Sequence, residues 1–204
     1  MKLTPGLIPY CNTVQFDPLY FENRVLLNLY ESGEFNTDDY VGVISTRVKE
    51  KTGMSVTDFL LQMWQCEPKD IYIWCAYDSD FAQNFWNNTF VISRMIQKII
   101  NERYSSLLPF EINNETWENC YCNFAVMRGE IMRSYVELVL KPVVNLFETT
   151  TDPDLLNLLS HKITHRGNLV NIHPFFLEGL MGSFIGNFPY THQTLSHPKD
   201  YVSR

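Results

Sequence analysis

Two aspartates spaced two residues apart, Asp78 and Asp80, follow an apolar run that is typical of a buried β-strand, Asp70 to Tyr77 (DIYIWCAY). Mg²⁺ and Mn²⁺ prefer carboxylate oxygens as ligands, and Mg²⁺ is usually held by one or two carboxylates together with phosphate oxygens. The pair is therefore a candidate site for a divalent cation. The same Asp-Ser-Asp sequence also suits the start of the next helix, because an N-cap carboxylate accepts backbone N–H groups.

Three cationic residues, Arg47, Lys49 and Lys51, follow a second apolar run, Tyr40 to Ser45 (YVGVIS). Such a continuous run with β-branched residues predicts a central strand with both faces covered. Open α/β sheets bind their ligands beside the carboxyl ends of their strands, which is where these cations would lie. A solvated loop with lysine and arginine at its tip explains them equally well.

A single amide, Asn123, occurs in a short apolar run from Tyr121 to Met127. A helix is predicted directly after it, with one face formed by Ile131, Tyr135, Leu138 and Val139. Leaving a buried amide unpaired costs on the order of 1–3 kcal/mol. Either a nearby backbone group or a ligand must therefore satisfy Asn123, and an ordinary turn or N-cap role is the alternative to ligand binding.

One carboxylate, Glu178, stands among Phe, Leu and Met in the predicted helix from His173 to Phe184 (HPFFLEGLMGSF). Burying a carboxylate without a partner is costly, and partial burial raises its pKa toward the range that a catalytic base needs. The alternative is a glutamate that points outward into solvent.

Three stretches of the chain together resemble bacterial glycosyltransferases of the GT-A type, which build capsule and lipopolysaccharide sugars. They are N-F-x-V-M-R-x-x-I-x-x-Y from Asn123 to Tyr135, Y-V-G-V at Tyr40 to Val43 with the polar and basic residues after it, and the late helix containing Glu178. The likeness runs loosely from about residue 38 to residue 185.

This resemblance implies transfer of a sugar from a nucleotide-diphosphate donor to a glycan acceptor. It assigns Asp78 and Asp80 to a Mn²⁺ or Mg²⁺ ion and the donor diphosphate, and Arg47 to the leaving diphosphate. Asn123 and Glu178 would face the acceptor, with Glu178 as the catalytic candidate. Little chain precedes Tyr40 to form the βα unit that grips the nucleotide base in GT-A domains. The alternative function is therefore a non-catalytic, abbreviated glycosyltransferase-like protein that acts in binding or assembly.

The 204 residues are predicted to form a single α/β domain with a strand-rich part (1–80), a mostly helical part (81–186) and a surface tail (187–204). The expected architecture is GT-A-like, with a small mixed or mainly parallel sheet flanked by helices. Apolar spacing and start and stop signals predict helices over 19–31, 56–65, 81–104, from Pro153 onward and from His173 onward. In the helix over 81–104, the residues expected to face the core are Phe90, Met95, Ile96, Ile99 and Ile100. We expect Lys141-Pro142 to kink the helix that follows Asn123.

Composition excludes several other classes of protein. A net charge of −7 and an isoelectric point near 5.2 argue against a nucleic-acid partner, because no basic stripe is present. Five irregularly spaced cysteines favour reduced thiols over a disulfide framework. The sequence lacks a signal peptide and any apolar run long enough to span a membrane, so we expect a soluble, cytoplasmic protein. His161 and His165, four residues apart, lack a third candidate zinc ligand.

Overall fold

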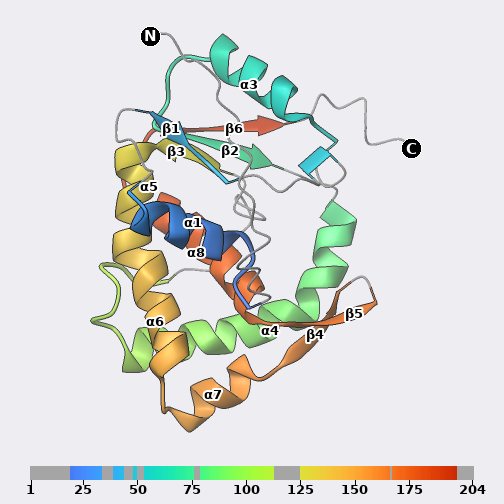
Figure 1. Ribbon diagram of the computed structural model, residues 1–204. Coiled ribbons are helices and arrows are strands. Elements are labelled where there is room, and N and C mark those ends of the chain that lie inside the picture. Colours follow the sequence, from blue (N-terminus) through green and yellow to red (C-terminus); the bar gives the residue numbers. More distant parts are fainter. Residues whose placement is uncertain are drawn as a thin grey trace.

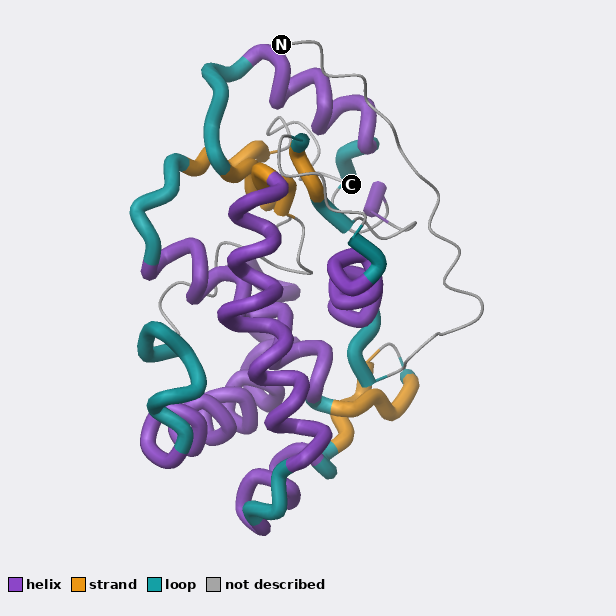
Figure 2. The backbone as a smooth tube through the Cα atoms, turned by 60° about the vertical axis from the view of Figure 1, so that its left-hand side comes forward, coloured by secondary structure: helices purple, strands orange, loops and turns teal. Residues whose placement is uncertain are grey.

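The computed structural model of the chain describes residues 19–33, 39–43, 48–49, 53–75, 79–112, 125–165 and 167–196, and for residues 75, 79–90, 165 and 196 it describes the backbone only. The described elements are arranged around a four-stranded sheet, with helices above and below it (Figures 1 and 2). The chain is thus an α/β protein, as the sequence predicts.

The sheet is mixed, and its strands follow the order β1-β3-β2-β6. These strands are Tyr40–Val41 (β1), Ala125–Arg128 (β3), Ile71–Cys75 (β2) and His192–Ser196 (β6). β3 runs antiparallel to both β1 and β2, whereas β2 and β6 are parallel. Of the two expectations for the sheet, a mixed sheet is confirmed and a mainly parallel one is not.

Two strand predictions need correction. Among the described residues, β1 covers Tyr40–Val41 and lies at the edge of the sheet, so the Tyr40–Ser45 run does not form the expected central strand; Ile44 and Ser45 lie outside the described residues. Gly42 then crosses β3 so closely that an added Cβ would lie 2.7 Å from the Ala125 carbonyl oxygen, which explains the glycine in this apolar run. In the predicted surface tail, His192–Ser196 pair with β2 and so belong to the sheet.

One face of the sheet is covered by α3 (Val56–Gln65), which lies above the strands in Figure 1. The predicted limits of this helix agree with the observed ones. The Ser55 side chain accepts the Asp58 N–H and the Asp58 carboxylate accepts the Ser55 N–H, forming a capping box. Phe59 of α3 stacks on Trp74 of β2, with ring centroids 4.3 Å apart, in a small core of its own.

The opposite face carries the larger core, whose central helix is α8 (His173–Asn187). Buried residues surround α8 on nearly every side, as expected for a helix that is apolar all round. The other helices of this layer are α1 (Glu22–Glu31), α4 (Ser79–Arg103), α5 (Gly129–Tyr135), α6 (Lys141–Thr149) and α7 (Pro153–Leu159). A small hairpin, β4 (Lys162–His165) and β5 (Asn168–Asn171), leads from α7 into α8.

Pro142 is accommodated by a π-helical turn, η3 (Val136–Leu140), which joins α5 to α6. Proline has no N–H, and its ring clashes with the carbonyl four residues earlier in a regular α-helix. Lys141 N–H instead bonds to the Val136 carbonyl, five residues back, which widens the turn just before the proline. The expected disturbance at Lys141-Pro142 therefore takes the form of a wider turn.

Several predictions of which residues face the core are wrong. Leu138 is 42% exposed and Met95 is 50% exposed, although Ile96, Ile100, Tyr135 and Val139 are buried as expected. Because Leu138 lies within η3, whose turn is wider than that of an α-helix, a periodicity of 3.6 residues mispredicts its direction. His161 and His165 do not share a helical face, since α7 ends at Leu159 and His165 belongs to β4.

Candidate functional site

The strand directions bring three chain segments to one end of the sheet, meaning the side at which strands start or stop. β1 and β2 point the same way, because each is antiparallel to β3, which lies between them. β1 and β2 therefore both run toward the end of the sheet at which β3 begins, where Ile73 pairs with Ala125. β1 itself stops at Val41, which pairs with Met127 and so lies level with Ile71 at the start of β2, and Gly42 continues alongside Ala125. In Figure 1 the arrowhead of β2 points to this end of the sheet, from which the chain leads on to α4.

Three of the predicted site residues, Arg47, Asp78 and Asn123, lie outside the described residues. Asp80 lies in the first turn of α4, which begins at Ser79, directly after the segment that follows β2. This backbone position agrees with both interpretations of the Asp-Ser-Asp sequence. Asp80 is therefore located by its backbone alone, and Glu178 is the predicted site residue whose side chain the structure describes.

Glu178 lies in the first half of α8 and is half-buried. Its neighbours along the helix, Phe176, Leu177 and Leu180, are completely buried. Glu178 is also the only acidic residue in α8, all of whose residues are described. The helix thus holds one carboxylate at the margin of the main core, a position that fits both a catalytic base and a glutamate facing solvent.

The opposite end of the sheet, where β2 and β6 begin and β3 ends, carries a polar cluster that the sequence analysis did not single out. The Asp70 carboxylate accepts the Thr191 N–H at 2.9 Å and the Thr191 hydroxyl at 2.8 Å. Its other oxygen lies 3.1 Å from the Arg128 Nε. These contacts join the starts of β2 and β6 to the end of β3, so Arg128, part of the Asn123 motif, has a structural role here.

The pKa of Asp70 is lowered, mainly by the hydrogen bonds from the Thr191 hydroxyl and backbone N–H. Close by, burial is the main cause of a raised pKa at Tyr40 and Tyr190. The Tyr40 hydroxyl donates to the Lys69 carbonyl. No local sequence signal marks this cluster, because Asp70 and Thr191 are 121 residues apart.

A second ionic cluster joins α4 to α7. Arg103 Nη1 lies 2.8 Å from Asp152 Oδ2, and Nη2 lies 2.7 Å from Asp154 Oδ2. Asp152 is also the N-cap of α7, and the hydrogen bond from Arg103 is the main cause of its lowered pKa. Both aspartates are thus used in fixing the start of a helix.

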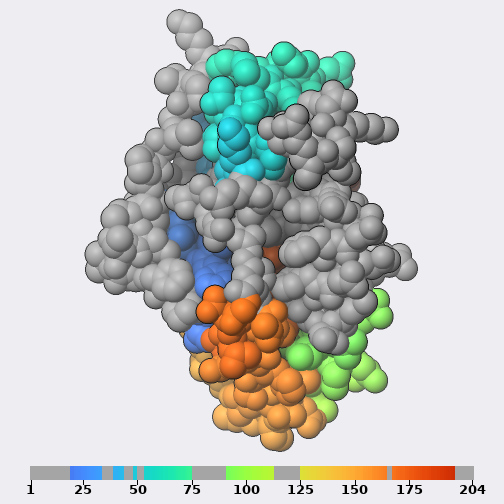
Figure 3. Space-filling view, turned by 90° about the vertical axis from the view of Figure 1, so that its right-hand side faces the viewer, coloured from blue at the N-terminus to red at the C-terminus, as the bar shows by residue number. Residues whose placement is uncertain are grey.

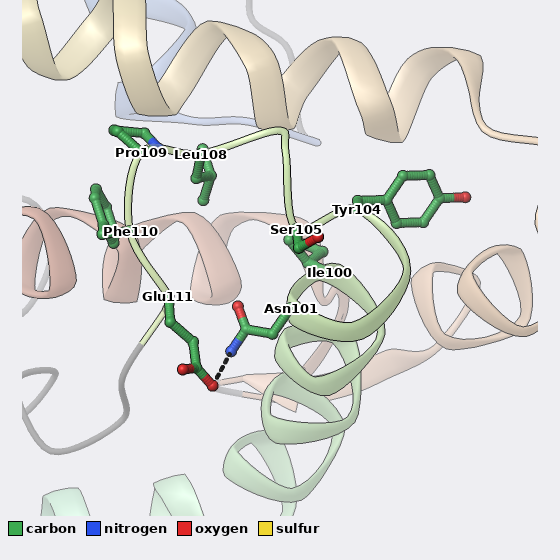
Figure 4. Close-up of a pocket in the computed structure, with 8 residues that line it drawn as sticks. All are labelled: Ile100, Asn101, Tyr104, Ser105, Leu108, Pro109, Phe110 and Glu111. Carbon is green, nitrogen blue, oxygen red and sulfur yellow. Dashed lines mark hydrogen bonds between the residues drawn. The ribbon is translucent and has the colours of Figure 1, made fainter.

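A cavity of about 320 Å³ lies beside the carboxyl end of α4, between that helix and the loop that follows it (Figure 4). Its lining combines apolar and polar side chains: Ile100, Asn101, Tyr104, Ser105, Leu108, Pro109, Phe110 and Glu111. Asn101 donates to and accepts from the Ile112 backbone, which holds the loop against the helix. Its amide also lies 3.5 Å from the Glu111 carboxylate.

In the part of the chain that the structure describes, no three or more His, Cys, Asp or Glu side chains gather as a metal site would require. Every helix within that part is too short or too polar to cross a membrane. No protein-family model matches the chain, and neither does any curated protein or any solved structure.

Proposed function

We propose that this chain is a glycosyltransferase-like protein that transfers a sugar from a nucleotide-diphosphate donor to a glycan acceptor. The observation that supports the proposal is the end of the sheet toward which β1 and β2 run and at which β3 begins. Along the sequence, Asp78 follows the end of β2 by three residues, and Asn123 precedes the start of β3 by two. Asp78 and Asn123, from distant parts of the chain, thus belong to segments that join the sheet at the same end.

In this proposal, Asp78 and Asp80 bind the donor diphosphate through Mn²⁺ or Mg²⁺, whose preference for carboxylate oxygens suits this pair. A bound ion of this kind supplies charge neutralisation for a diphosphate leaving group. Arg47, four residues beyond the described Val43, adds a cation to the same group. Catalysis is then positioning of the two sugars together with stabilisation of negative charge.

Glu178 acts as the general base that accepts a proton from the acceptor hydroxyl, and Asn123 orients the acceptor. The half-buried position of Glu178 on α8 supports its role, because a rigid, mostly buried helix fixes the carboxylate in one place.

A thermal-shift series tests the donor site. The wild type, Asp78→Asn/Asp80→Asn and the control Glu102→Gln are each heated with UDP-, GDP-, CMP- or dTDP-sugars, with and without Mn²⁺. Glu102 is exposed and makes only a 3.8 Å ion pair with Lys98. Ligand at about 100 times its dissociation constant adds about 2.7 kcal/mol, which in a chain of this size raises Tm by roughly 5–10 °C.

We expect one nucleotide class to stabilise the wild type and the control in a metal-dependent way, and the double variant to lose this effect. If no donor stabilises the wild type, the donor-site proposal is wrong.

Glu178→Gln separates catalysis from binding. With an acceptor-independent assay of donor hydrolysis, we expect at least about a hundredfold lower turnover, because a general base contributes roughly 10²–10⁴-fold. The donor-dependent rise in Tm should stay, since Glu178 is assigned to the acceptor side. A wild type that binds donor but releases no sugar would instead belong to the non-catalytic, abbreviated class.

A further inference from the structure

Three half-buried aromatic side chains, Phe110, Phe188 and Tyr190, form a row on the surface of the main core. The ring centroids of Phe110 and Phe188 are 5.9 Å apart, and those of Phe188 and Tyr190 are 5.7 Å apart. Phe188 and Tyr190 are nearly parallel, whereas Phe110 is perpendicular to Phe188 and lines the 320 Å³ cavity. We call these three residues the aromatic row.

The core holds the aromatic row in place. Phe188 and Tyr190 both contact the fully buried ring of Phe184 in α8, at 4.8 and 5.7 Å between centroids. The loop carrying Phe110 is fixed by the paired hydrogen bonds between Asn101 and the Ile112 backbone. A ligand that binds here therefore loses little free energy to ordering the protein.

Acidic groups border the aromatic row at both ends. At the cavity end, the exposed Glu111 carboxylate lies 3.5 Å from the Asn101 amide nitrogen, a contact marked by the dashed line in Figure 4. At the other end, the Asp70 carboxylate lies beside Tyr190, because it accepts the N–H and the hydroxyl of the next residue, Thr191. The negative charges of Glu130 and Asp70 add to the effect of burial in raising the pKa of Tyr190. Glu130 is exposed, while Asp70 is already bonded to Thr191 and Arg128.

We infer that the aromatic row and the cavity beside Glu111 form a binding surface for a carbohydrate chain. The C–H face of a sugar ring is apolar and packs on aromatic rings, while its hydroxyl groups donate hydrogen bonds to carboxylates. A proline-rich peptide also packs on aromatic rings, but it presents carbonyl acceptors and needs donors from the protein. The acidic border therefore favours a hydroxyl-rich ligand.

This surface differs from the proposed donor site. Tyr190 precedes β6, and Asp70 precedes β2, so the aromatic row stops at the end of the sheet where these two strands begin. The donor site is assigned to the opposite end of the sheet, where β2 ends and β3 begins. The surface would hold a glycan away from the point of transfer, and its existence does not depend on the donor site.

Isothermal titration with neutral oligosaccharides tests the inference. The probes are hexasaccharides of glucose, mannose and N-acetylglucosamine, with a decapeptide of proline as the competing class. The variants are Phe110→Leu and Glu111→Gln in the loop after α4, with the exposed Glu102→Gln in the last turn of α4 as the control. Phe110→Leu keeps an apolar side chain against Phe188, and circular dichroism checks that each variant is folded.

We expect at least one hexasaccharide to bind the wild type and the control equally, and Phe110→Leu to bind about tenfold more weakly, the loss expected for one aromatic contact. Glu111→Gln should weaken binding severalfold, while both variants keep the thermal response to nucleotide-sugars seen in the wild type. The inference is overturned if no hexasaccharide binds, if the folded variants bind as the wild type does, or if the proline peptide alone binds.

Discussion

The carboxylate of Asp70 joins residues that are far apart in sequence, since it accepts two hydrogen bonds from Thr191 and pairs with Arg128. A hydrogen bond to a charged group contributes about 1.5–3 kcal/mol to the free energy of unfolding when it is shielded from solvent. The Asp70 side chain is 28% exposed, so solvent screens part of the attraction to Arg128. We therefore regard Thr191 as the more important partner.

Asp70→Asn should lower stability in a pH-dependent way. The pKa of Asp70 is lower in the folded chain than in the unfolded one, so its contribution is present above the unfolded pKa of about 3.9 and is lost as pH falls through the folded value. We expect the variant to lose about 1–2 kcal/mol in the free energy of unfolding at pH 7, with the difference from wild type shrinking below pH 4. Urea unfolding at several pH values measures this, and a constant difference from pH 7 to pH 3 would contradict it.

Among the elements, α3 shows how local sequence sets the limits of a helix. Its start is defined by the reciprocal bonds between Ser55 and Asp58, and its buried side by Phe59 and Met63. All of these residues lie within nine positions of one another in sequence, so no tertiary information is needed to find them.

Ser55→Ala should destabilise the protein by about 1 kcal/mol, because the helix then loses the side-chain acceptor for an N–H in its first turn. The matched control is Thr57→Ala, an exposed position in the same turn, for which we expect a change within about 0.5 kcal/mol. Denaturant titration followed by tryptophan fluorescence reports on both, since Phe59 of this helix stacks on Trp74. Equal effects of the two variants would show that the cap adds nothing.

At the scale of the whole molecule, the sheet separates two cores of unequal size. The smaller core, under α3, includes Trp74 of β2 and Leu195 of β6, and the larger one surrounds α8. The space-filling view in Figure 3 shows α3 at one end of the molecule and the α7 and β4–β5 region at the other. Because β6 comes from the end of the chain, the smaller core is complete only after most of the sequence is in place.

Leu195→Ala should cost about 2–4 kcal/mol, because this side chain is 3% exposed and its loss leaves a cavity between β6 and α3. Thr194→Ala, the exposed neighbour on the same strand, is the control and should change stability far less. Thermal unfolding of both variants measures the difference. If both changes were small, β6 would not contribute to the core as the structure indicates.

The sequence by itself was enough to predict the α/β class, the helix Val56–Gln65, the buried strand that becomes β2, and the helices around Tyr135 and Glu178. These rest on periodicity and on caps, which act between residues a few positions apart. Prediction failed where the local pattern was interrupted, as for Leu138 within the π-helical turn and for His161 and His165 beyond the end of α7.

Only the tertiary structure decided which strands are neighbours. Tyr40–Val41 lie at an edge and His192–Ser196 beside β2, because β-pairing joins residues far apart in the chain and depends on which strand edges remain available. The same long-range pairing brings Asp70 to Thr191 and forms the aromatic row from Phe110, Phe188 and Tyr190. Residue types and spacing thus determined the elements and the candidate chemistry, whereas contacts between distant segments decided how the candidate sites are arranged.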